Sequence, residues 1–339
     1  MRPRSLPLSP PGYRSAPQAA GPGTIGAVRA VAFSRFGGPE VLEVADLPAP
    51  EPGPNEVRIR VMAATVNPTD LGLRAGQRAD DLAGLPPPYV PGMELAGVVD
   101  AIGPDTEWLL ADRVMAIVLP TRTGRGAQAE QVVVPADSVA PMPNEETSFE
   151  AAATIPMNGL TARRALDLLA LQPGQTLAVT GAAGAVGGYV TQLAAAEGVR
   201  VIAVASPGDE PLLRRLGAEH FVPRGDTVAA SIRGLVPDGV DAVVDAAVIG
   251  PAVLPAIRDA GQLAAVRAFD GQSERGITIR PVRVSDYAHN QEALRRLSSL
   301  AAEGDLMLRV AEALPPERAA EAHRKLARGG LRGRLVIVF

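Results

Sequence analysis

The chain has 339 residues, of which 47% are hydrophobic and only 3% aromatic, and its formal net charge is −4. This length allows two domains with sizeable cores, and a slightly negative charge without a basic stripe argues against a nucleic-acid partner. The absence of cysteine excludes disulfides, a thiolate nucleophile and cysteine-ligated zinc, and no apolar run approaches the roughly 20 residues that cross a bilayer, so we expect a cytoplasmic protein without a membrane partner.

The composition changes near residue 28. Residues 1–27 hold six prolines, three arginines and no acidic residue, which predicts a disordered N-terminal extension. Residues 28–146 carry short apolar runs broken by glycine and proline, and they predict a β-rich domain with strands over residues 57–61, 96–103 and 131–134. The first of these runs alternates apolar and polar residues, as a half-buried strand does.

From residue 147 helices alternate with apolar strands. Ser148 is a suitable N-cap, with Glu150 in the first helical turn. The predicted strands cover residues 177–180, 200–205, 220–223, 241–246 and 262–266, with a helix after each of the first four. This strict alternation predicts an α/β fold, a doubly wound parallel sheet of the Rossmann type, over residues 147–287.

Three later elements complete the predicted fold. A β-run over residues 276–284 extends the edge of the parallel sheet, and because an unpaired edge is a liability we expect a homodimer through this strand. A helix over residues 291–303 and a strand over residues 334–339 follow. The last strand is expected to return to the first domain, so that residues 288–339 complete it.

A glycine-rich turn carries the strongest functional signal. Residues 179–188 read V-T-G-A-A-G-A-V-G-G, between a predicted strand and a predicted helix that leads into a second strand. This is the layout of a dinucleotide-binding unit, in which backbone N–H groups at a helix N-terminus hold a pyrophosphate. We therefore expect the cofactor to be bound by Gly181, Ala182, Ala183, Gly184, Ala185, Val186 and Gly187.

The end of the second strand indicates which dinucleotide binds. An acidic residue there would bond the ribose 2′-OH of NAD, but the strand ends in Ala205-Ser206-Pro207-Gly208. The Ser206 hydroxyl can bond a 2′-phosphate, and Arg224, after the third strand, is the basic residue best placed to reach it. Arg214 is expected to be a solvated helix residue. The sequence thus favours NADPH over NADH.

Several other charged residues are expected to lie on the surface. The three histidines, His220, His289 and His323, are far apart and show no metal-ligand spacing. Asp209 and Glu210 follow a Pro-Gly turn that is expected to point them outward. A solvated face is also expected for the C-terminal arginines rather than a basic rim for phosphates, and these are Arg328, Arg332 and Arg334.

Five stretches resemble one protein family in combination. They read F-G-G-P-E-V-L at 36–42, A-T-V-N-P-T-D at 64–70, P-G-M-E-L-A-G-V-V at 91–99, N-G-L-T-A at 158–162 and G-R-L-V at 333–336. Together with the order of the domains, they resemble the medium-chain dehydrogenase/reductase superfamily, in its zinc-independent quinone oxidoreductase branch. The resemblance covers residues 28–339.

The resemblance implies a GroES-like substrate domain, a Rossmann domain and NADPH in the cleft between them, without zinc, because Val66-Asn67 stands where zinc-dependent members carry a cysteine ligand. It implies hydride transfer to a small quinone or α,β-unsaturated carbonyl substrate. Asn67 is the candidate catalytic residue, unless it only stabilises the turn before Pro68; Asp70 is expected to be structural. Thr154 and Thr161 are expected near the nicotinamide, unless Thr154 only packs in the interior, and so is either Arg267 or Phe269. The tyrosine that some members carry after the asparagine is missing, which favours solvent as the proton source.

Two alternatives stay open. An enoyl reductase acting on thioesters shares the fold and the cofactor, and a non-catalytic NADPH-binding protein, like the lens crystallins of this family, is favoured slightly by the missing tyrosine. A short-chain dehydrogenase is excluded, because none of the four tyrosines has a lysine four residues later.

Overall fold

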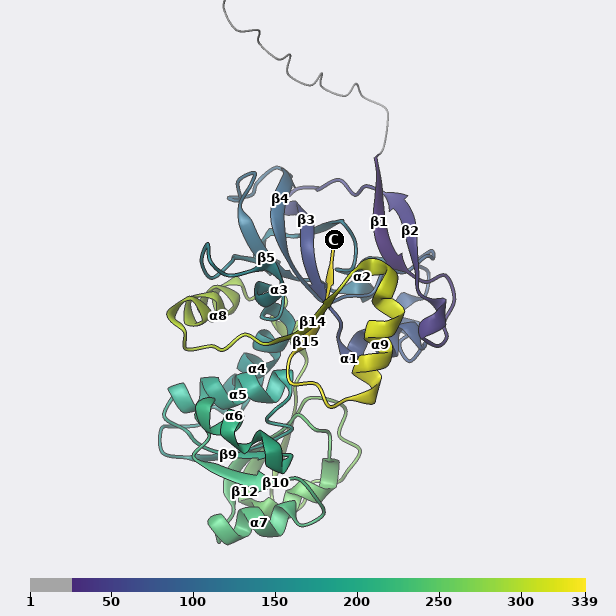
Figure 1. Ribbon diagram of the computed structural model, residues 1–339. Helices are drawn as coiled ribbons and strands as arrows, with labels where there is room; N and C mark the ends of the chain where they lie inside the picture. Colours follow the sequence, from purple (N-terminus) through teal and green to yellow (C-terminus); the bar gives the residue numbers. More distant parts are fainter. Residues whose placement is uncertain (1–25) are drawn as a thin grey trace, which may run out of the picture.

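The computed structural model describes residues 26–339, drawn in colour in Figure 1. The predicted disorder of residues 1–25 lies outside this range. The predicted extension ends one residue too late, however, because Ala27 already belongs to strand β1 (Ala27–Ala32), which pairs with β2 (Glu43–Pro48).

A six-stranded parallel sheet forms the lower half of the molecule in Figure 1. Its strands are β8 (Thr176–Thr180), β9 (Arg200–Ala205), β10 (His220–Pro223), β11 (Val240–Asp245), β12 (Ile257–Ala265) and β13 (Thr278–Pro281). Their spatial order is β10-β9-β8-β11-β12-β13, the 3-2-1-4-5-6 order of a doubly wound dinucleotide-binding sheet. The prediction of a parallel α/β sheet is therefore confirmed.

Helices cover both faces of this sheet. On one face the core joins Leu177 and Val179 to helices α4 (Pro156–Leu169), α5 (Ala185–Ala196), α6 (Glu210–Arg215) and α8 (Gln291–Glu303). On the other face Ala178 packs with α7 (Val228–Leu235) and with a 3₁₀ helix at Gly250–Ala256. The helix predicted between β11 and β12 is this short 3₁₀ segment, because Pro251 and Pro255 remove backbone donors from a regular α-helix.

The second large sheet is β-rich and mostly antiparallel. Its order is β14-β15-β3-β4-β5-β7, and β6 also pairs with β3. The strands are β3 (Glu56–Thr65), β4 (Glu94–Ile102), β5 (Arg113–Ile117), β6 (Gln131–Pro135), β7 (Val139–Pro141), β14 (Val310–Leu314) and β15 (Arg334–Val338). The predicted C-terminal strand therefore does return to the sheet of the early residues, with Val336 opposite Thr65 (yellow in Figure 1).

Four short helices border this sheet. They are α1 (Pro68–Arg74), α2 (Pro120–Thr123), α3 (Phe149–Ala152) and α9 (Ala319–Arg328). Ser148 caps α3 as predicted, because its side chain accepts a hydrogen bond from Ala151 N–H. Helix α9, which the sequence did not predict, lies beside α1 in Figure 1 and packs its apolar face against Leu335 and Ile337 of β15.

His323 on α9 was expected at the surface and is instead fully buried. It lies on the same face of the helix as Ala319, Ala322 and Leu326. Neither ring nitrogen has a hydrogen-bond partner among residues 26–339. Burial, together with the nearby charge of Arg74, lowers the pKa of His323 to about 3.

This buried histidine predicts a loss of stability in acid. Between pH 6.5 and pH 3 the His323 imidazole is protonated in the unfolded chain but stays neutral in the folded chain. The free energy of unfolding therefore falls as the pH falls. Between pH 6.5 and pH 4.5 the His323 contribution amounts to about 2–3 kcal/mol. Urea unfolding at several pH values should show this slope, and His323→Phe should remove it.

The control is His220→Phe, because His220 is about one-third exposed and pairs with Glu219. This variant should keep the acid sensitivity of the wild type. Equal pH dependence in His323→Phe and the wild type would contradict the explanation.

Candidate functional site

A cleft of about 850 Å³ lies between the two sheets. One wall comes from α1, α2 and the first turns of α4, and the other from the carboxyl ends of β8, β11, β12 and β13; the chain before β15 closes a third side. The carboxyl edge of a parallel sheet at the point where strand order reverses is where doubly wound folds bind ligands. Here that point lies between β8 and β11.

The predicted glycine turn opens into this cleft. Gly181, Gly184, Ala185, Val186 and Gly187 line it, and Gly184 is the N-cap of α5. The first N–H groups of a helix have no acceptor within the helix, so α5 offers them to an anion. The side chains of Ala182 and Ala183 are buried beneath the turn, so these two residues offer a ligand only their backbone.

Two glycines in this turn cannot carry a side chain. Gly181 has φ +61°, and a Cβ there would lie 3.1 Å from Ala247 N. A Cβ on Gly187 would lie 2.8 Å from Ala182 Cα and closer still to the Gly181 carbonyl oxygen. The backbone of the turn is thus folded tightly on itself, which fits the close approach that a pyrophosphate requires.

Arg309 holds this turn from outside and was missed by the sequence reasoning. Its guanidinium donates to the carbonyl oxygens of Ala183 (3.0 Å) and Gly184 (2.7 Å). Burial lowers its pKa below the usual value. No local pattern reveals this contact, because it spans more than a hundred residues.

Ser206 and Arg224 lie side by side at the ends of β9 and β10. Pro223 is opposite Ala205 in the sheet, and Arg224 N–H donates to Ala205 C=O at 2.8 Å. Ser206 is half-buried and Arg224 is exposed. Neither lines the cleft; they lie beyond β8, on the side away from β11.

Asp209, expected to point outward, is largely buried and forms a bidentate ion pair with Arg332. This pair joins the segment after β9 to the segment before β15. The Arg332 side chain is 41% exposed, in agreement with the solvated face expected for it. Only the expectation for Asp209 is wrong, because Asp209 pairs with this guanidinium instead of pointing outward.

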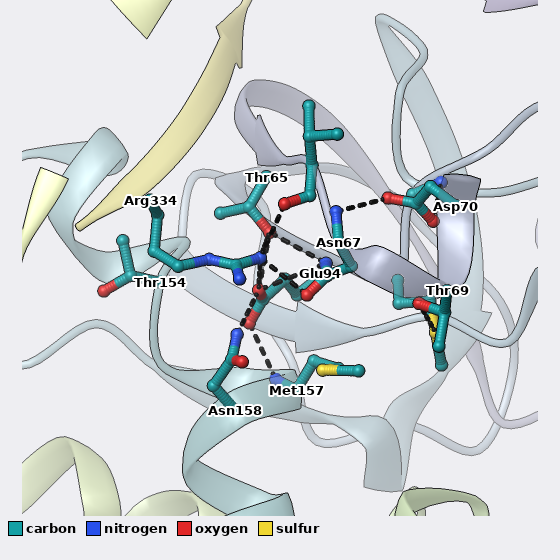
Figure 2. A network of polar contacts seen from close by, with 12 residues as sticks. Thr65, Asn67, Thr69, Asp70, Glu94, Thr154, Met157, Asn158 and Arg334 are labelled. Carbon is teal, nitrogen blue, oxygen red and sulfur yellow. Dashed lines mark hydrogen bonds and ion pairs between the residues drawn. The ribbon is translucent and has the colours of Figure 1, made fainter. Parts of the chain in front are cut away.

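Glu94 is the centre of a buried polar network that joins β3, β4 and β15 to the start of α4 (Figure 2). Its Oε1 accepts hydrogen bonds from Thr65 Oγ1 (2.5 Å) and Asn158 Nδ2 (2.9 Å), and it forms an ion pair with Arg334 Nη2 (3.0 Å). Its Oε2 accepts from Met157 N–H at 2.8 Å, at the first turn of α4. The carboxylate thus satisfies a helix N-terminus and a buried guanidinium at once.

The Arg334 side chain, also expected on a solvated face, is only 6% exposed. Besides Glu94, its Nη2 donates to Thr65 Oγ1, Val66 C=O and Asn67 Oδ1 at 2.6–3.0 Å. Because the two side chains come from β4 and β15, neither could be recognised as a pair from local sequence.

Asn67 belongs to this network rather than to the lining of the cleft. Its side chain is fully buried, with Oδ1 accepting from Arg334 and Nδ2 donating to Thr65 Oγ1 at 3.1 Å. It is also the N-cap residue of α1, before Pro68. The placement favours the turn-stabilising reading over direct contact with a ligand.

Asp70 lines the cleft, and both of its oxygens accept backbone hydrogen bonds. Oδ2 accepts from Asn67 N–H at 2.8 Å and Oδ1 from Gly92 N–H at 3.0 Å. Burial raises the pKa of Asp70 to about 7, against the lowering effect of these two bonds. These contacts agree with the structural role expected for it.

Thr154 and Phe269 lie outside the main cleft. Thr154 is fully buried and shares a hydrogen bond of 2.9 Å with the Tyr189 hydroxyl, so it packs between α3 and α5. Phe269 lines a neighbouring cavity of about 210 Å³, whereas Arg267 lines both spaces. Of the residues predicted near the nicotinamide, Thr161 and Arg267 line the main cleft.

The residues present do not fit a zinc site. Where a cysteine ligand would stand, Val66 and Asn67 are fully buried, and Asn67 is committed to the Glu94 network. No group of three or more histidine, cysteine, aspartate or glutamate side chains among residues 26–339 could hold a metal ion. Nor does any helix in the same range have the length and apolar character to span a membrane.

Two family models match the chain. The alcohol dehydrogenase GroES-like domain matches residues 53–144, and the zinc-binding dehydrogenase model matches residues 216–337. The quinone oxidoreductase of Lama guanicoe is 33% identical over 225 residues, which are 64% of this chain and 66% of that protein. The synaptic vesicle membrane protein VAT-1 homolog of Rattus norvegicus is 36% identical over 225 residues, 64% of this chain. The match spans about half the length of the VAT-1 homolog, 53%.

Solved structures resemble nearly the whole fold. The quinone oxidoreductase from Coxiella burnetii has a TM-score of 0.80 at 29% identity, covering 93% of this chain and 100% of the other. An NAD-dependent alcohol dehydrogenase has a TM-score of 0.81 at 32% identity, covering 92% and 99%.

Proposed function

Because the chain belongs to the medium-chain dehydrogenase/reductase superfamily, in its quinone oxidoreductase-like branch, we propose that it is a zinc-independent oxidoreductase that uses NADPH to reduce a quinone or an α,β-unsaturated carbonyl compound. The observation that carries the proposal is the glycine turn at the start of α5, which faces the same cleft as the wall formed by α1 and α2. A cofactor held there would meet a substrate held by the other wall.

Different residues bind different parts of the cofactor. The N–H groups of Ala185, Val186 and Gly187 hold the pyrophosphate, and the Ser206 hydroxyl and the Arg224 guanidinium take the 2′-phosphate. When bound, the dihydronicotinamide supplies a hydride to the electron-poor carbon of the substrate and leaves as NADP⁺, while water supplies the proton.

The rest of the cleft orients the substrate and excludes water. Met93, Leu119, Met157 and Leu331 give it apolar walls. Such walls favour a flat apolar substrate, and closeness to the cofactor contributes to the rate without a covalent step. We assign no protein proton donor and give Asn67 a positioning role, through Arg334 and Thr65.

We propose the same domain organisation and assembly that the sequence predicts. Residues 28–146 and 288–339 form the GroES-like part and residues 147–287 the Rossmann part. We propose a homodimer through β13, whose outer edge has no partner strand among the described residues; a single-chain mass in light scattering would exclude it. The cytoplasmic location stays a prediction from the sequence.

The test is oxidation of NADPH, followed by absorbance, with 1,4-naphthoquinone, a short enone and a simple aldehyde, each repeated with NADH. We expect turnover with the first two substrates and unchanged rates after treatment with a chelator. Oxidation of primary alcohols that a chelator abolishes would contradict the zinc-independent reaction. Tight NADPH binding without turnover of any quinone or enone would favour a non-catalytic protein.

The cofactor preference is expected to reverse when Ser206 is replaced by aspartate. The new carboxylate repels the 2′-phosphate of NADPH and can bond the 2′-OH of NADH. Ser206→Asp should lower kcat/KM for NADPH by about 100-fold, equivalent to about 2.7 kcal/mol, and raise it for NADH. Arg224→Gln should lower kcat/KM for NADPH by about tenfold and leave kcat/KM for NADH unchanged.

Arg296→Gln is the matched control, since Arg296 is exposed on α8 and does not line the cleft. It should leave kcat/KM unchanged for both NADPH and NADH. A wild-type enzyme that prefers NADH, or an Arg224→Gln variant that loses both cofactors equally, would refute the assignment of the 2′-phosphate site.

A further inference from the structure

The charges that line the cleft are strongly unbalanced. Five arginines line it against one acidic residue, and these are Arg78, Arg122, Arg267, Arg283, Arg334 and Asp70. The whole chain, in contrast, has a net charge of −4. The excess of positive charge is therefore a property of this cleft and not of the surface in general.

Three of the five guanidinium groups have protein partners. Arg334 is paired with Glu94, and Arg78 with Asp81 at 2.5 Å. Arg122 lies 3.0 Å from His289 Nε2, and the other nitrogen of this ring is bound by Asp137. The positive charge of these three arginines is therefore wholly or partly balanced by neighbouring residues of the protein.

Arg267 and Arg283 differ from these three. Both are exposed, and neither side chain makes a hydrogen bond or an ion pair with any residue of the described chain from Gly26 onward. They follow β12 and β13, two neighbouring strands at one end of the parallel sheet. Two free guanidinium groups thus face the cleft from adjacent strand ends.

The cofactor phosphates do not account for these two arginines. The glycine turn follows β8, and the proposed 2′-phosphate site lies at the ends of β9 and β10. β12 and β13 lie on the opposite side of β8, beyond β11. In a doubly wound sheet that side receives the nicotinamide half, next to the substrate.

The one acidic residue does little to cancel this charge. Both oxygens of Asp70 are occupied by backbone N–H groups. Burial raises the pKa of this carboxyl to about 7, so a large fraction of it is neutral near neutral pH.

We propose that the substrate of this cleft carries an anionic group close to its reducible carbonyl, and that Arg267 and Arg283 bind that group. Carboxylate, sulfonate and phosphate share the required chemistry, because a guanidinium fork binds two anionic oxygens at once. This inference rests on the proposed function for its reaction, but the binding of the anion can be measured without turnover.

The first test is calorimetry on the full chain saturated with NADP⁺. Naphthalene-2-carboxylate and naphthalene-2-carboxamide have the same shape and differ in charge. The carboxylate should bind at least about tenfold more tightly, the effect of a charge-assisted hydrogen bond, and the difference should shrink as salt rises. In the double variant Arg267→Gln/Arg283→Gln the two ligands should bind equally, whereas Arg296→Gln should keep the preference.

Equal binding of the two ligands by the wild type would overturn the proposal, whether or not the protein turns over a substrate. A preference that survives in the double variant would also overturn it. Circular dichroism and NADP⁺ affinity check that the double variant is folded and loaded.

The second test separates two sources of the anion. Turnover of 1,4-naphthoquinone-2-sulfonate relative to 1,4-naphthoquinone, as a ratio of kcat/KM, should fall about tenfold in the double variant, with the neutral quinone little changed. A parallel pair compares crotonyl-coenzyme A with its neutral N-acetylcysteamine thioester. Loss of preference in the thioester pair alone would place the anion in the distant coenzyme phosphates and contradict the compact anion proposed here. If the wild type reduced none of these substrates, the proposed function would be refuted, and the calorimetry alone would test the binding of the anion.

Discussion

Replacing Gly187 by alanine is expected to lower the affinity for NADPH by at least about 100-fold, which corresponds to about 2.7 kcal/mol. The added Cβ would collide with backbone, at Ala182 Cα and at the Gly181 carbonyl. Backbone cannot move aside as a side chain can, so the turn must open and the N–H groups of α5 lose their common direction. Fluorescence titration with NADPH measures the loss.

Two glycine variants serve as controls. A Cβ on Gly208 meets nothing within 4 Å, so Gly208→Ala should bind NADPH as the wild type does. A Cβ on Gly188 would strike only the Arg309 side chain, which can shift, so Gly188→Ala should lose less affinity than Gly187→Ala. Wild-type affinity in a folded Gly187→Ala protein would show that the cofactor does not bind at this turn.

The second large effect is expected from Glu94→Gln. The amide keeps the shape of the side chain but leaves the buried guanidinium of Arg334 without its counter-charge, and breaking a buried pair in this way costs about 3–5 kcal/mol. Because the pair joins β4 to β15 and to the start of α4, the midpoint of urea unfolding should fall, and the bound-cofactor signal should be lost at lower urea than in the wild type.

Glu219→Gln is the matched control, since the Glu219–Arg200 pair is exposed on both sides. Exposed pairs contribute about 0–1 kcal/mol, so this variant should unfold close to the wild type. Combining Glu94→Gln with Arg334→Met removes the orphaned charge and should cost less than the sum of the two single changes. Full additivity would mean that the two side chains are not energetically coupled.

The sequence predicted the elements whose signal is local. Strands β8 to β11 and the glycine turn were placed within a residue or two, because apolar runs and turn residues report on their own segment. The Ser148 cap was recognised for the same reason. The regular helix expected after β11 was wrong, because Pro251 and Pro255 limit this segment to a 3₁₀ helix.

The contacts that hold the site together could not be predicted in this way. Glu94 meets Arg334, Asp209 meets Arg332, and Arg309 meets the glycine turn, each across more than a hundred residues. Each of these side chains, read alone, is a charged residue that belongs on a surface. Only the tertiary fold brings each of these side chains to its partner. The burial of His323, which has no hydrogen-bond partner among residues 26–339, likewise depends on the tertiary packing of α9.

The position of β15 between β14 and β3 has a consequence for synthesis on the ribosome. The strands of the parallel sheet all lie between Thr176 and Pro281, so this sheet can assemble while the rest of the chain is still being made. The β-rich sheet begins earlier, at Glu56, yet it lacks two strands until Val338 has emerged. Domains made first usually fold first, but here every strand of the later-made parallel sheet has been synthesised before residues 334–338 complete the β-rich sheet.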